Sequence, residues 1–167
     1  QVAERGTLLE PLSLKIYRFA ATTTGEFSQD HGGTLASVLS AVVAYTNDVS
    51  AVFERDMALR LQLVANEEKI IYLDPNTDLF PPNAGNAECA GINTGIANTN
   101  IGVSKYDVGH VYKQGGGGVS LGLGNVCGQG KGGGCSAGFG FNGDYGSSFR
   151  GVIGQEVGHQ LSAGHTW

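Results

Sequence analysis

The sequence predicts one α/β domain with a mostly parallel sheet, and three segments support this fold class. Residues 12–20 begin with alternating apolar and polar side chains and continue as an apolar run, which is typical of a strand that becomes buried on both faces. Residues 34–53 carry apolar side chains mostly three and four positions apart, which predicts a long amphipathic helix with Thr34 as its N-cap. Residues 59–63 alternate strictly again. This order predicts a right-handed crossover between two parallel strands.

The middle of the chain predicts shorter elements. Residues 70–73 can extend the second strand across a short bend. Residues 74–100 are rich in Pro, Asn, Gly and Thr, so we expect an irregular loop with one short helix near residues 88–97. Residues 108–112 predict a third strand, and residues 119–126 keep an apolar period of two that predicts a fourth.

Composition restricts the classes of function. The 167 residues, 41% of them hydrophobic, suit a single domain over residues 1–167. A formal charge of −5 with ten scattered Lys and Arg argues against nucleic acid as a partner. The apolar stretches are interrupted before the roughly 20 residues that a membrane span needs. No leader opens the chain, so we expect either a cytosolic protein or one whose leader and propeptide are absent from this chain.

The three cysteines favour an oxidising compartment. Cys127 and Cys135 bracket a glycine-rich stretch and could close a small disulfide ring, which would leave Cys89 free or paired outside the chain. The alternative is three reduced structural thiols. Residues 127–146 are so rich in glycine that we expect a long surface loop.

A final helix is predicted from Ser147 or Ser148, either of which is a suitable N-cap. It carries one apolar stripe, made of Phe149, Ile153, Val157 and Leu161. A second stripe has no side chains and consists of Gly151, Gly154 and Gly158. Because each glycine costs about 1 kcal/mol of helix propensity, this second stripe suggests tight packing against another backbone.

The end of this helix carries the residues of a metal site. In a zinc helix, ligands four positions apart lie one turn apart, and the residue after the first ligand reaches water on the ion. Gln155 and His159 occupy the ligand positions here, and Glu156 occupies the position of the general base. His165 can join them only if the helix stops and the chain turns back. By contrast, His31 and His110 are expected to be hydrogen-bonded structural residues.

The chain resembles the reprolysin-like metzincins, and in particular the bacterial secreted members of that group. Residues 155–165 are similar to the signature HExxHxxGxxH, with Gln155 at its first His and Ser162 at its Gly. Further similar segments follow one another along the chain: 17–20, 23–26, 31–34, 53–56, 61–66, 106–111 and the four glycines 115–118.

The resemblance implies a twisted, mostly parallel sheet whose antiparallel edge strand binds a peptide by main-chain hydrogen bonds. In this chain, that strand would include Val119, Ser120, Leu121, Gly122 and Leu123. The resemblance also implies a zinc ion held by His159 and His165, with Gln155 at the third ligand position and Glu156 as the general base. The family's Met-containing turn and lower subdomain would follow Trp167, so we expect the upper part of a catalytic domain.

Two functions follow from these observations. The first is a secreted zinc endopeptidase acting on protein or peptide substrates. The alternative is a pseudopeptidase of the same fold that binds peptides or protein partners without cutting them, because the amide of Gln155 is a weaker ligand than imidazole. A glycine-rich adhesive module ranks last, since the glycines show no fixed period.

Overall fold

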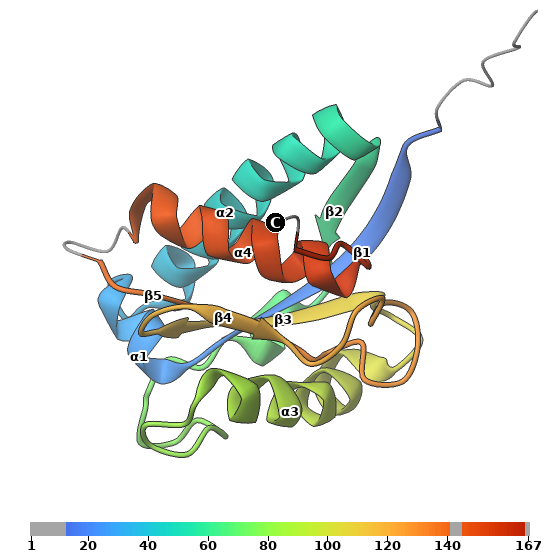
Figure 1. Ribbon diagram of the computed structural model, residues 1–167. Helices are drawn as coiled ribbons and strands as arrows, with labels where there is room; N and C mark the ends of the chain where they lie inside the picture. Colours follow the sequence, from blue (N-terminus) through green and yellow to red (C-terminus); the bar gives the residue numbers. More distant parts are fainter. Residues whose placement is uncertain (1–12, 141–144, 166–167) are drawn as a thin grey trace, which may run out of the picture.

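The computed structural model describes residues 13–140 and 145–165 and has a five-stranded sheet with helices on both faces (Figure 1). The strands are β1 (Lys15–Thr23), β2 (Leu59–Leu63), β3 (Val108–Gln114), β4 (Gly118–Ser120) and β5 (Gly134–Gly138). Their order in the sheet is β2-β1-β3-β5-β4, and only the pairing of the edge strand β4 with β5 is antiparallel. The predicted fold class, a mostly parallel sheet with an antiparallel edge strand, is therefore confirmed.

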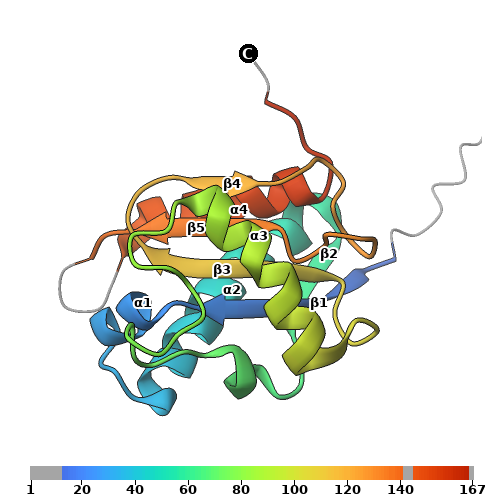
Figure 2. The same ribbon diagram turned by 90° about the horizontal axis from the view of Figure 1, so that it is seen from below.

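Two hydrophobic clusters lie on opposite faces of the sheet. On one face pack α2 (Leu35–Met57) and α4 (Gly146–Gln160), with α1 (Gly25–Asp30) at the end of β1. On the other face α3 (Asn86–Ala97) lies across the strands (Figure 2). Two short helical turns, η1 (Glu67–Ile70) and η2 (Asn98–Gly102), join this second layer. The predicted short helix is thus present as α3, and residues 70–73 do not lengthen β2, because Ile70 closes η1 and only Ile71 forms a bridge to Thr23.

The long helix α2 begins where the sequence predicts. Thr34 forms a capping box with Ser37, and the helix ends at Met57, followed by the C-cap Ala58 in a left-handed conformation with φ of 51°. By length and apolar composition alone, this helix could cross a membrane. In the fold, its apolar face packs on the sheet through Val38, Val42, Tyr45, Val49 and Phe53, which is the arrangement of a core helix in a globular domain.

The prediction of a surface loop over residues 127–146 is wrong for its central part. Residues 134–138 form β5, which is buried along its whole length between β3 and β4. The predicted fourth strand is also shorter than expected, because β4 ends at Ser120. Of the predicted loop, residues 141–144 lie outside the described residues.

The glycines of β5 explain why a segment with low strand propensity forms a strand inside the sheet, between β3 and β4. A Cβ atom at Gly134 would lie 2.3 Å from both Gln160 Oε1 and His110 Nδ1, and one at Gly138 would lie 2.3 Å from the ring of Tyr145. The missing side chains allow α4 to lie directly on the backbone of β5. The stripe on α4 itself does not have this role, because a Cβ at Gly151 or Gly154 would meet nothing within 4 Å.

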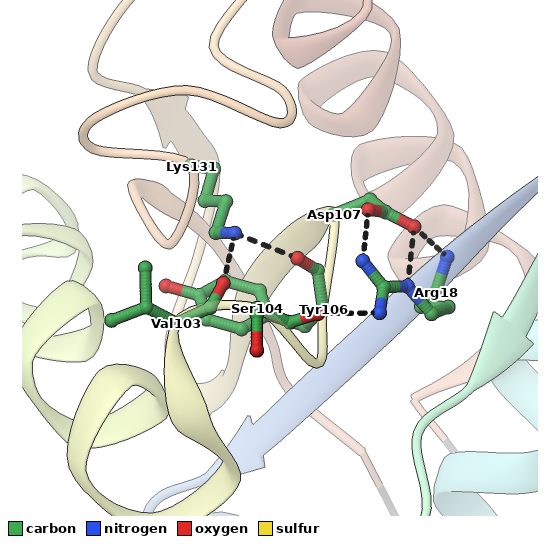
Figure 3. Close-up of polar contacts among 6 residues, drawn as sticks. All are labelled: Arg18, Val103, Ser104, Tyr106, Asp107 and Lys131. Carbon is green, nitrogen blue, oxygen red and sulfur yellow. Dashed lines mark hydrogen bonds and ion pairs between the residues drawn. The ribbon is translucent and has the colours of Figure 1, made fainter.

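Polar contacts fix the segment that leads into β5 (Figure 3). The ammonium group of Lys131 donates to the carbonyl oxygens of Val103 and Tyr106 and lies 4.3 Å from the centre of the Tyr106 ring. Beside it, Arg18 of β1 binds both carboxylate oxygens of Asp107. These contacts hold the turn before β3 against the glycine-rich segment, so that β5 enters the sheet in register with β3.

Candidate metal and catalytic site

The helix α4 brings the predicted site residues to one end of the sheet. Phe149, Ile153 and Val157 are buried against the sheet, which leaves the C-terminal turns of α4 beside the edge strand β4. The helix begins after Tyr145, whose side chain makes no capping hydrogen bond, so the prediction of Ser147 or Ser148 as the N-cap is wrong. The position of α4 therefore depends on its buried face and on the glycines of β5.

Glu156 lies under the edge strand. Its side chain is 6% exposed, and a Cβ atom at Gly118 would lie 2.5 Å from Glu156 Cγ. Burial raises the pKa of this carboxyl, while His159, His165 and the backbone N–H of Ser120 each act in the opposite direction. A partly desolvated carboxylate beside two imidazoles has the environment of a general base.

The chain turns back after α4 and brings His165 to His159. The N–H of Ala163 donates to the carbonyl of Gly158, and that of Ser162 donates to the carbonyl of His159, which together form a Schellman motif. Ser162 adopts φ of 81° at the position that favours glycine. As a result, the ring centroids of His159 and His165 lie 4.6 Å apart.

The tautomer of His159 suits a metal ligand. Its Nδ1 lies 2.7 Å from the carbonyl oxygen of Ala163, and because a carbonyl only accepts, Nδ1 carries the proton. The Nε2 lone pair is then directed away from this bond and is available to a cation, which is the usual arrangement around a zinc-binding histidine.

Gln155, which the sequence predicts as the third ligand, is exposed on α4 one turn before His159. Within residues 13–140 and 145–165, no group of three or more His, Cys, Asp or Glu side chains could hold a metal ion. Two imidazoles and one amide oxygen fit a zinc ion, which binds nitrogen and oxygen donors, although the amide contributes less than a third imidazole.

The predicted peptide-binding segment lies next to these residues. Val119 and Ser120 belong to β4, with Ser120 opposite Gly134 of β5. Leu121, Gly122 and Leu123 continue beyond the strand, and the side chains of Leu121 and Leu123 are 49% and 65% exposed. One edge of β4 is paired with β5 and the strand ends the sheet, which is the position from which an extended peptide can be added.

A buried polar chain that the sequence did not predict holds the last turn of α4. Gln160 Nε2 donates to the carbonyl of Gly109, so its Oε1 accepts from Nδ1 of His110 at 2.9 Å. Burial lowers the pKa of His110 to about 4, and its neutral ring accepts from Ser136 at Nε2, at 2.8 Å. Strands β3 and β5 and helix α4 are thus joined at Gln160, the residue adjacent to His159. His110 is 50 positions from Gln160 and 26 from Ser136, so no local sequence pattern indicates these hydrogen bonds.

We expect His110→Phe to lower the free energy of unfolding by about 2–4 kcal/mol, because the ring volume is kept while Gln160 and Ser136 both lose a buried partner. Ser136→Ala removes only the second hydrogen bond and should cost less than His110→Phe. Urea unfolding of both variants measures the difference. Equal, small losses of unfolding free energy in the two variants would show that the hydrogen bonds of His110 do not stabilise α4.

The other predicted residues lie away from this site. His31 is buried, with Nδ1 2.7 Å from the carbonyl oxygen of Phe27, in agreement with a structural role. The ring expected between Cys127 and Cys135 is not formed, because all three cysteines are free thiols in the structure. Cys127 is exposed, whereas Cys135 is buried on the face covered by α3.

Comparison with known proteins identifies one family. A family model described as "Metallo-peptidase family M12B Reprolysin-like" matches residues 13–167, nearly the whole chain. No curated protein matches the sequence. The matched segment contains every strand and helix of the fold and all of the candidate site residues.

Proposed function

Because the chain belongs to the reprolysin-like metallopeptidases of family M12B, we propose that it is a zinc-dependent endopeptidase with Glu156 as its general base. The observations that support this most directly are the return of the chain after α4, which brings the ring of His165 to that of His159, and the position of Glu156 on the same helix, buried against Gly118 of the edge strand. Peptidase families of this kind act on proteins outside the cell, so we also propose secretion.

In this proposal, His159, His165 and Gln155 would hold the ion. When bound there, zinc would lower the pKa of a water ligand towards about 7 and polarise the carbonyl of the scissile peptide bond. Glu156 accepts the proton of the attacking water and later donates it to the leaving amine. Its burial favours this exchange, because a raised pKa brings a carboxyl closer to the working pH.

The edge strand would orient the substrate. An extended peptide added to β4 runs antiparallel to it and is held by main-chain hydrogen bonds, so its carbonyl groups lie in a fixed register relative to Glu156. Gly118 permits this arrangement, because any side chain there would displace Glu156. Fixed register relative to the base is what converts peptide binding into attack on one carbonyl.

Gln155 distinguishes this proposal from a pseudopeptidase. We expect the purified protein to contain zinc and to cleave an unstructured protein substrate, and we expect a chelator to abolish cleavage. Gln155→His should bind zinc about 10–100-fold more tightly, since imidazole replaces a neutral amide oxygen. Zinc content by mass spectrometry and competition with a chromogenic chelator measure the change.

The matched control is Gln62→His, which adds an imidazole at an exposed position of β2, far from α4 in the fold. It should leave zinc affinity unchanged. If the wild type binds no zinc and cuts no substrate, while Gln155→His gains both, the chain is a pseudopeptidase. If zinc affinity rises equally in both variants, Gln155 is not at the ligand position.

A further inference from the structure

Two cysteines from distant parts of the chain meet in the core, at a place unrelated to the catalytic site. Cys89 lies on α3 and Cys135 on β5, and both side chains are fully buried in the same hydrophobic cluster. Figure 2 shows α3 crossing the sheet at this level, and helix and strand are in direct contact. The two thiols are close enough for each to shift the pKa of the other.

The side-chain direction of Cys135 is fixed by the sheet. Cys135 pairs with Val111 of β3 and with Val119 of β4, so its position in the strand cannot shift without breaking both ladders. This register points the thiol at α3. Cys127 cannot take the place of Cys89, because it is exposed in the segment before β5, where its N–H donates to the carbonyl of Asp107.

We propose that Cys89 and Cys135 form a disulfide bond that joins α3 to β5. Formation removes one proton from each thiol and two electrons from the pair, and a disulfide oxidant, either glutathione disulfide or a protein disulfide, accepts the electrons and protons as two thiols. The cross-link would close a loop of roughly 45 residues, a length for which disulfides stabilise appreciably.

Burial sets when the bond forms. An oxidant cannot reach fully buried sulfur atoms, so exchange takes place while α3 is still undocked from β5 during folding. Once α3 is packed, the same burial protects the disulfide from reductants. The proposal therefore requires refolding in a redox buffer rather than oxidation of the folded, reduced protein.

The test is a peptide map of protein refolded from denaturant in a glutathione redox buffer, alkylated without reduction and digested. We expect one linked pair of peptides, containing Cys89 and Cys135, and an alkylated Cys127. Cys127→Ser should give the same linked pair. Full alkylation of all three cysteines, or a link from Cys127 to either of the others, would overturn the proposal.

Thermal unfolding provides a second readout. Reduction should lower the melting temperature of the wild type and of Cys127→Ser by on the order of 10 °C. It should not change that of Cys89→Ser, in which the bond between Cys89 and Cys135 cannot form. If Cys89→Ser does not fold, the comparison of wild type with Cys127→Ser remains decisive, because an unchanged melting temperature on reduction of both contradicts the cross-link.

Discussion

Glu156→Gln will lower kcat for peptide hydrolysis by about 10²–10⁴-fold and leave zinc binding in place. The glutamine side chain has the same shape, so the packing of α4 against Gly118 of β4 is kept. It cannot accept a proton from water, which removes the step that we propose for the buried carboxylate. Cleavage of a quenched fluorescent peptide gives kcat, and metal analysis gives the zinc content of the same sample.

The matched control is Glu88→Gln, which makes the same change at an exposed position on α3. It should keep wild-type kcat and KM. If Glu156→Gln retains full activity while zinc is bound, a different group is the base. If Glu156→Gln loses zinc as well as activity, the carboxylate stabilises the ligands rather than the reaction.

The first half of the fold was predictable because its elements carry their own patterns. The alternation in β2, the continuous run that ends β1 and the apolar face of α2 arise from burial in one sheet, whereas the alternating residues Leu14 and Ile16 before that run are exposed. Thr34 could be identified as the N-cap because a capping side chain acts within one turn. These signals are local, and the structure agrees with them.

The strand β5 could not be predicted for the opposite reason. Its residues are small, with no branched or aromatic side chain, and it is buried by what packs on it: α4 on one face and α3 on the other. Glycine indicates a loop when it is judged alone, but in β5 it provides the space that Gln160 and Tyr145 fill. Only knowledge of these distant partners distinguishes the two cases.

The candidate site was predictable in part. Spacing predicted that Glu156 and His159 lie on one helix and that the chain turns back before His165, and the structure contains both the helix and the turn. The sequence did not indicate that Gly118 covers Glu156, nor that Cys135 faces Cys89, since these contacts depend on strand order. The order β3-β5-β4 became known only with the structure.

The second large effect concerns a buried carboxyl away from the site. β1 continues beyond its last pairing with β2, at Phe19 and Leu63, so the next free N–H on that edge belongs to Ala21. Glu67 of η1 fills the gap, and its Oε1 accepts this N–H at 2.7 Å. Its Oε2 has no hydrogen-bond partner among the described residues. Burial raises the pKa of Glu67 to about 8.

This raised pKa makes stability depend on pH. The folded protein holds the Glu67 proton between its ordinary pKa of 4.5 and about 8, whereas the unfolded chain releases it near 4.5. The stabilising contribution is therefore complete below pH 4.5 and is lost as the pH rises to about 8. The difference in pKa corresponds to about 5 kcal/mol, at about 1.4 kcal/mol for each pH unit.

Glu67→Gln should therefore raise the free energy of unfolding at pH 8 by several kcal/mol and change it little at pH 4.5, since the amide keeps the acceptor for Ala21 without a charge. Urea unfolding of the wild type and of Glu67→Gln between pH 4.5 and pH 8 gives the difference in unfolding free energy at each pH. All other groups titrate alike in the two proteins, so their contributions cancel in this difference. Glu68→Gln, at the exposed neighbouring position, should keep most of the wild-type slope. Parallel curves for wild type and Glu67→Gln would mean that the Glu67 carboxyl is ionised in the folded protein at neutral pH, and that its charge is stabilised there by solvent.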